Sequence, residues 1–279
     1  MRWGLGRGSG NIEDRRGLGP VAGGVGIGGV VLALLGYFVF GIDPQQTLGM
    51  VQGAGGAQQQ QGEMGAPTDE GGRFASQILG STEDVWGAIF RQAGQQYAPP
   101  TTVIYTQGTS TGCGFGQSAM GPFYCPADRR IYLDLDFFKQ LETQFGAPGE
   151  FARAYVIAHE VGHHIQTLTG TSAQVRQAQQ GARSQGEANE YSVRLELQAD
   201  CYAGVWAKHS NDQRGWLDPG DVEAGMRAAS AVGDDALTKG RVSPDAFTHG
   251  TSEQRTRWFT IGYQSGDPDS CDTLRAPRL

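Results

Sequence analysis

The sequence predicts an α+β domain that follows a single N-terminal transmembrane helix. Residues 21–42, "VAGGVGIGGVVLALLGYFVFGI", contain no charged residue and are long enough to cross a bilayer as a helix. Short β-branched segments begin at residue 101, and long helical patterns fill the chain after residue 149. Few strands early in the chain and helices later are typical of an α+β fold.

The arginines predict how this helix is oriented. Four of them, at positions 2, 7, 15 and 16, precede the apolar run, and no lysine or arginine follows it before Arg73. The positive-inside rule then makes residues 1–20 a cytoplasmic tail and places the rest in the periplasm or outside the cell, on a single-pass inner-membrane anchor. A cleavable signal peptide has a shorter apolar core and a small-residue cleavage site, which this run lacks. A buried glycine-rich core helix and an incomplete twin-arginine signal are the weaker alternatives.

Composition divides the remainder of the chain. Residues 43–72 are rich in glycine and glutamine and have few large apolar side chains, so they predict a flexible linker before a domain at 73–279. The net charge is −7 over 279 residues, which leaves no basic field for nucleic acid. The spacing of Gly24 and Gly28 would suit helix pairing in a membrane but arises easily by chance, so the oligomeric state stays open.

The four cysteines all lie in the part expected outside. An even number in an oxidising compartment predicts two disulfides. Cys113 and Cys125 would close a short loop, which leaves Cys201 to pair with Cys271. Four buried thiols are the alternative, whereas a cysteine zinc site would need C-x-x-C pairs that the chain lacks.

Periodicity gives the elements of the domain in order. Helical patterns cover 81–97, 149–168, 187–210, 219–233 and 252–263, and a short one lies in "FFKQLETQFG" before Pro148. The segments 101–106 and 129–138 predict strands. The polar stretch 170–186 gives no clear pattern.

The segment "AYVIAHEVGHHIQTL", residues 154–168, predicts a metal site. His159 and His163 are four residues apart, so both imidazoles leave one helix face and can bind one ion. Glu160 lies beside that face and is expected to act as the general base toward an attacking water. His164 points about 150° away by helical geometry and is expected to be structural. Gly162 allows another element to approach closely.

A catalytic zinc ion needs a third protein ligand. The elongated metzincin motif is excluded because Gln166 and Thr169 stand where it needs glycine and histidine. Glu196 is the preferred candidate, and Asp200, on the same helix face, is expected to accept the free N–H of a ligand histidine. Glu187 and Glu190 remain rivals.

Small residues support the choice of Glu196. A stripe of them on the same helix would let it lie close against the helix of the histidines; these residues are Ala199, Ala203, Gly204 and Ala207. Glu190 has a simpler explanation as an ion pair with Arg194, four residues on.

H-E-x-x-H with a downstream E-x-x-x-D resembles the gluzincins. The chain is more closely similar to the neutral zinc metallopeptidases of the YpfJ type, almost from end to end. The strings that carry this likeness include "NIEDRRG", "GPFYCPADRRIYLDLDFF", "FGAPGEFARAYVIAHEVGHH", "SVRLELQADCYAGVWA" and "FTHGTSEQRTRWFTIGYQSGD". The resemblance implies a zincin-like domain with a small antiparallel or mixed sheet, active-site helices and one Zn²⁺ per chain. It also implies that His249 faces the oxyanion and that Arg255 braces the site.

The function expected from these features is that of a membrane-anchored zinc metallopeptidase acting on a peptide or protein. The strand at 130–135 would offer a shelf on which substrate adds as a further strand. The alternative is a membrane-anchored binding or assembly module with a structural zinc. Such a site would need a fourth protein ligand and would have no use for Glu160.

Overall fold

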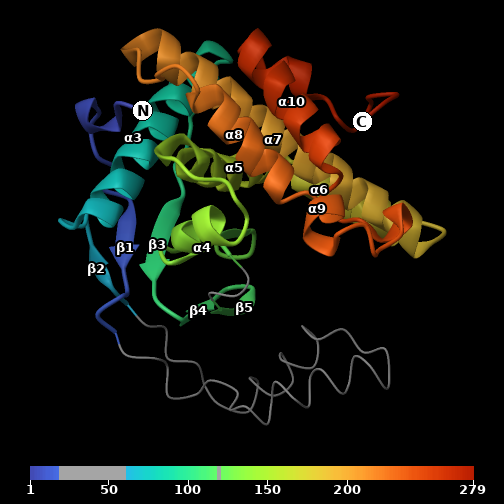
Figure 1. The fold of residues 1–279 in the computed structure, drawn as a ribbon, viewed down its shortest axis with the longest axis horizontal. Helices are drawn as coiled ribbons and strands as arrows, with labels where there is room; N and C mark the ends of the chain where they lie inside the picture. Colours follow the sequence, from blue (N-terminus) through green and yellow to red (C-terminus); the bar gives the residue numbers. More distant parts are fainter. Residues whose placement is uncertain (19–60, 118–120) are drawn as a thin grey trace.

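A mixed five-stranded sheet and a layer of helices form the domain (Figure 1). The computed structural model describes residues 1–18, 61–117 and 121–279. The sheet order is β2-β1-β3-β7-β6, and a separate hairpin contains β4 and β5. The strands are β1 (Ile12–Asp14), β2 (Glu63–Met64), β3 (Thr101–Tyr105), β4 (Gly108–Thr111), β5 (Gly114–Gln117), β6 (Phe123–Cys125) and β7 (Arg130–Asp134).

The two predicted strands, β3 and β7, form the centre of the sheet. They are parallel to each other, β1 is parallel to β3, and β6 is antiparallel to β7. Alternate side chains of these strands face opposite sides. Ile104 and Ile131 join the main core with the helices, while Tyr105 and Tyr132 join a smaller cluster on the other face. Because β7 has a neighbour on each side, it cannot accept a substrate strand as predicted, and β6 is the edge strand instead.

Helices occupy most of the second half of the chain. They are α3 (Glu70–Gln92), α4 (Phe137–Thr143), α5 (Glu150–Leu168), α6 (Thr171–Gln180), α7 (Gln185–Arg214), α8 (Asp221–Ala231), α9 (Asp234–Thr238) and α10 (Ser252–Ser265). The helices predicted at 149–168, 187–210, 219–233 and 252–263 are present as α5, α7, α8 and α10, whereas α6 and α9 were not predicted. Helix α3 begins at Glu70 rather than 81, since Asp69 caps it by accepting the backbone N–H of Gly72. Both α3 and β2 therefore begin inside the predicted linker.

The N-terminal residues belong to the folded domain. Strand β1 lies between β2 and β3, and Ile12 is fully buried. The arginines that suggested a cytoplasmic tail make ion pairs within the domain instead. Arg7 pairs with Glu83 and Asp84, Arg15 with Glu13, and Arg16 with Asp14 and Asp69.

This arrangement differs from the predicted tail at residues 1–20. In the antiparallel pair of β1 and β2, Asp14 lies opposite Glu63, so both flanks of the segment 19–60 lie at one edge of the sheet. A topology with residues 1–20 in the cytoplasm and residues 73–279 outside does not fit, because one sheet contains strands from both parts. Within the described part of the chain no helix is long and apolar enough to cross a membrane. Residues 21–42, where the anchor is expected, lie outside the described residues.

Both disulfides join the predicted pairs. Cys113 in the β4–β5 hairpin is bonded to Cys125 at the end of β6, and Cys201 on α7 is bonded to Cys271 near the C-terminus. The first disulfide fixes the hairpin to the edge strand. The second fixes the C-terminal segment to α7 at the residue that follows Asp200.

Candidate metal centre

Close packing of α5 against α7 creates the site. A Cβ atom at Gly162 would lie 3.0 Å from the Cα and the carbonyl oxygen of Ala199, so any larger residue would push the two helices apart by a few tenths of an ångström. The predicted stripe of small residues divides between two partners. Ala199 faces α5, whereas Gly204 faces α10, where a Cβ would lie 2.1 Å from the carbonyl oxygen of Phe259.

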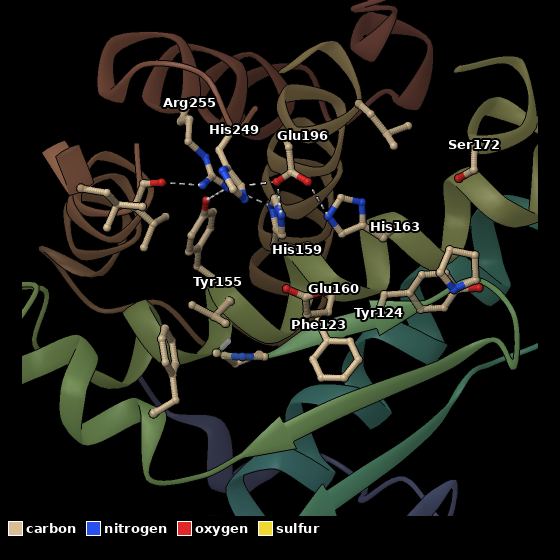
Figure 2. Close-up of a pocket in the computed structure, with 18 of the residues that line it drawn as sticks. Phe123, Tyr124, Tyr155, His159, Glu160, His163, Ser172, Glu196, His249 and Arg255 are labelled. Atoms are coloured by element: carbon tan, nitrogen blue, oxygen red, sulfur yellow. Dashed lines mark hydrogen bonds and ion pairs between the residues drawn. The ribbon is translucent and has the colours of Figure 1, made fainter. Parts of the chain in front are cut away.

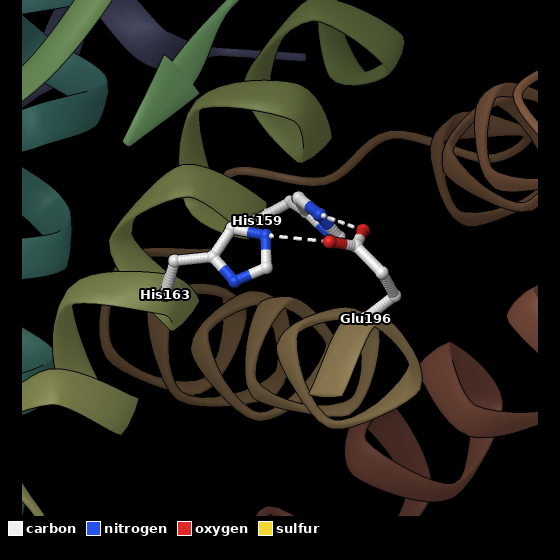
Figure 3. Close-up of side chains that lie close together, drawn as sticks. All are labelled: His159, His163 and Glu196. Carbon is white, nitrogen blue, oxygen red and sulfur yellow. Dashed lines mark hydrogen bonds and ion pairs between the residues drawn. The ribbon is translucent and has the colours of Figure 1, made fainter. Parts of the chain in front are cut away.

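Three side chains that can ligate a metal converge where α5 and α7 meet (Figure 3). The Nε2 of His159 lies 3.2 Å from the Oε2 of Glu196, and the Nε2 of His163 lies 3.3 Å from its Oε1. Ligand atoms about 2.0–2.1 Å from a tetrahedral zinc lie roughly 3.3 Å from one another. The donor set fits zinc, and because one atom from each residue lies within 4.8 Å of the others, small side-chain adjustments would bring the donors to that spacing.

Hydrogen bonds behind the rings hold these donors in place. The Nδ1 of His159 lies 2.8 Å from the Oδ1 of Asp200, and the Nδ1 of His163 lies 2.9 Å from the Oε1 of Gln166. The Gln166 amide nitrogen donates to the carbonyl oxygen of Leu195, so its oxygen faces His163. In the neutral form that binds a metal, each ring donates from Nδ1 and presents the lone pair of Nε2 to the metal position.

Asp200 is in turn held by two groups. The guanidinium of Arg255 contacts both carboxylate oxygens, with Nε 2.8 Å from Oδ2 and one terminal nitrogen 2.9 Å from Oδ1. The hydroxyl of Tyr155, one turn before His159, donates to Oδ1 at 2.5 Å. Such a bidentate pair is the strong form of a charged hydrogen bond, so Asp200 has one fixed orientation.

Opposite charges balance in this buried cluster. Burial raises the pKa of Asp200, but the charges of Arg255 and His159 outweigh it and hold that pKa below its usual value. Burial lowers the pKa of His159, whereas the carboxylates of Asp200 and Glu196 raise it to about 10. Each charge is thus paired, which is the condition for keeping charged groups inside a protein.

Glu160 faces a cleft beside the three donors (Figure 2). It is 7% exposed, and burial raises the pKa of its carboxyl group. No side chain or backbone group in the described part of the chain hydrogen-bonds to the carboxylate of Glu160. Its oxygens are therefore available to a water or a substrate in the cleft.

The cleft has a volume of about 690 Å³. Its walls come from β6, α4, α5, α6, α7 and the segment between α8 and α10. His249 stands on this last segment, and its side chain is 48% exposed. Its Nδ1 lies 3.1 Å from the Oδ1 of Asp234. The other oxygen of Asp234 accepts the backbone N–H groups of Thr248, His249 and Gly250, so the loop and the ring are held by one carboxylate.

The structure separates the candidate ligands clearly. Glu196 lies with the histidines, whereas Glu190 pairs with Arg194 and Glu187 accepts the backbone N–H of Arg183 at the start of α7. His164 lies on the other side of α5, 2.7 Å from the carbonyl oxygen of Ala98.

Three residues of the site were not predicted from the sequence: Tyr155, Gln166 and Asp234. Gln166 follows His163 by three residues on one helix face, which was an available signal. The other two act through residues that are distant in sequence, so no local pattern identifies them.

A group of two histidines and one glutamate is a donor set found in catalytic zinc sites. The family described as "Putative neutral zinc metallopeptidase" matches residues 1–274, and the chain belongs to this family.

Relatives support the assignment along the chain. The uncharacterized protein YpfJ of Escherichia coli K12 is 50% identical over 290 residues, covering 98% of this chain and 99% of its own length. The uncharacterized protein Rv2575 of Mycobacterium tuberculosis H37Rv is 43% identical over 220 residues, covering 74% and 73%. No solved structure matches the chain.

Proposed function

We propose that this protein is a zinc-dependent peptidase in which Glu160 is the general base. The observation that carries the proposal is the position of Glu160, next to the three donors, open to the cleft and without a partner in the described chain. Three protein donors leave one tetrahedral position for chemistry, whereas a structural zinc would want a fourth. Among the described residues, only His159, His163 and Glu196 gather as such a group of donors.

Each residue then has a defined task. Zinc in this site would supply Lewis-acid polarisation of the scissile carbonyl. Glu160 accepts a proton from the attacking water and delivers it to the leaving amine. His249, held at Nδ1 by Asp234, donates to the oxygen that gains negative charge. Asp200 and Arg255 hold His159 in its orientation.

The edge strand β6 is the proposed shelf for the substrate. Among the described strands it pairs with β7 alone, and Phe123 and Tyr124 line the cleft. The unpaired edge offers backbone groups to an extended peptide, as in other complexes formed by strand addition. The disulfide at Cys125 and the buried His164, 3.2 Å from the Tyr124 hydroxyl, hold this strand beside α5.

The two disulfides support an oxidising compartment as the place of action. Residues 21–42 are apolar enough to associate with a membrane. A single crossing there would separate residues 1–18 from residues 61–279, which share one sheet, so the association we propose keeps both parts on the same side.

The experiment is a digest of a mixed peptide library by the full-length, zinc-loaded protein, read by mass spectrometry. The expected result is chelator-sensitive cleavage that the Glu160→Gln variant, still holding zinc, does not perform. Equal cleavage by both proteins would reject Glu160 as the base. No cleavage by either would favour the alternative of a binding module.

A further inference from the structure

The cleft has two ends of different chemistry, ordered along α5. Val156 lies one turn before His159, and Ser172 at the start of α6 contacts Thr167, one turn after His163. Figure 2 shows this order, with Tyr155 on one side of the metal-binding group and Ser172 on the other. A peptide that crosses the metal position must therefore contact both ends.

The end near Gly121, just before β6, is aromatic, since a Cβ atom there would contact Phe137. Phe137 and Phe145 are half-buried rings of the cleft wall with centroids 6.2 Å apart. Leu237 of α9, a large apolar side chain that is 44% exposed, also lines the cleft. Exposed apolar groups gathered in a cleft mark a place where an apolar ligand group is buried.

The end near Ser172 is cationic. Arg176 of α6 is exposed and lines the cleft, and no ion pair joins it to another residue that the structure describes. This contrasts with Arg7, Arg15, Arg16 and Arg255, which all pair with carboxylates. In a chain of net charge −7, an unpaired arginine in the cleft is available to an acidic group of the substrate.

The edge strand gives the direction of the peptide. A Cβ atom at Gly121, just before β6, would lie 3.1 Å from Phe137, while Tyr124 contacts His164. Strand β6 therefore runs from the aromatic end toward the cationic end. Antiparallel pairing is the more stable form, so a bound peptide runs the opposite way, from Arg176 toward Phe137.

We infer that the substrate is an extended peptide with an acidic residue before the scissile bond and a bulky apolar residue after it. Arg176 pairs with the acidic side chain, and Phe137 and Phe145 bury the apolar one. This inference rests on the proposed peptidase activity and names the substrate class of the same site.

The test compares two charge-reversal variants of the full-length, zinc-loaded protein. Arg176→Glu alters the cleft, and Arg183→Glu is the matched control, an exposed arginine just beyond α6 that does not line the cleft. The probes are paired quenched peptides that carry Asp or Lys before the cleaved bond. Arg176→Glu is expected to lower the ratio of kcat/KM for Asp over Lys peptides about tenfold, while Arg183→Glu leaves it within about twofold.

The apolar end has its own variant. Phe145→Ala is expected to lower kcat/KM for peptides with Phe or Leu after the bond about tenfold relative to peptides with Ala there. Cleavage whose flanking preferences are the same in Arg176→Glu and Phe145→Ala as in the unmodified protein would overturn this inference and leave the proposed function standing. Absence of any chelator-sensitive cleavage would reject the proposed function and the inference together.

Discussion

The Nδ1 of His159 lies 2.8 Å from a carboxylate oxygen of Asp200, and the same carboxylate binds Arg255. A ligand histidine is thus joined through one buried acid to an arginine on α10. Helix α10 therefore helps to orient the imidazole ring of His159 on α5. The metal-binding geometry depends on three helices, although only α5 and α7 supply donors.

We expect Asp200→Asn to weaken zinc binding by about 10- to 100-fold, because the amide no longer fixes and polarises His159. The variant should also be less stable by about 3–5 kcal/mol, since Arg255 is then buried without its carboxylate. Chelator competition gives the zinc affinity, and denaturant unfolding gives the stability. Tyr155→Phe is the control: it removes one hydrogen bond to Asp200, costs about 1 kcal/mol and should change zinc affinity only a few-fold. Equal zinc affinity in all three proteins would contradict the role of Asp200.

The second prediction concerns the third ligand. Glu196→Ala should bind zinc at least tenfold more weakly than the unmodified protein, because two histidines alone hold the ion loosely. Glu190→Ala, on the same helix and paired only with Arg194, should keep full zinc content. Metal analysis after dialysis against a weak chelator distinguishes the two. Full occupancy in Glu196→Ala would reject Glu196 as the third ligand.

The sequence predicts the centre of this site because its geometry is local. Because His159 and His163 are four positions apart on one helix, their side chains lie on the same face regardless of the rest of the fold. Predicting Glu196 as the third ligand required one further assumption, that a stripe of small residues marks the contact between two helices. Gly204 shows the limit of that step, because it packs against α10 and not against α5.

The sheet shows why other parts of the fold escaped prediction. Strand β1 is three residues long and pairs in parallel with β3, far along the chain. Such a pairing leaves no local pattern. The nearby arginines are compatible with a membrane-orienting tail or with ion pairs inside a domain. Composition alone favours the membrane-orienting tail. Only the positions of partners such as Glu83 and Asp69 decide between them.

The ion pair between Arg16 and Asp69 gives a pH-dependent test of this N-terminal docking. The bond to Arg16 lowers the pKa of Asp69 from 3.8 to about 2. Because the folded-state pKa is depressed, the pair stabilises the fold above about pH 4, and this contribution is lost as the pH falls toward 2.

Asp69→Asn keeps a capping side chain on α3 and removes only the charge. Its unfolding free energy should be lower than that of the unmodified protein by less than about 1 kcal/mol at pH 6, since the Asp69 side chain is half exposed. The difference should vanish near pH 2. Urea unfolding at several pH values measures this, and Asp272→Asn, an exposed acid near the C-terminus, is the comparison. A difference that does not change with pH would argue against the pair.

The last prediction concerns His249, which stands at the cleft with Nδ1 on Asp234. Its ring is 48% exposed, so removing it leaves no large cavity and should change stability little. A donor that meets charge only in the transition state contributes about 2.7–4 kcal/mol there and little in the ground state.

His249→Ala should therefore lower kcat by roughly a hundredfold or more, with much smaller changes in KM, zinc content and unfolding free energy. Asp234→Asn retains the ring but loses the carboxylate that holds it, so we expect a smaller fall in kcat. Steady-state kinetics on one quenched peptide, with metal analysis of each variant, measure these effects. If His249→Ala loses stability in proportion to its activity, the ring is a packing residue, because a donor acting on the oxyanion leaves the ground-state fold intact.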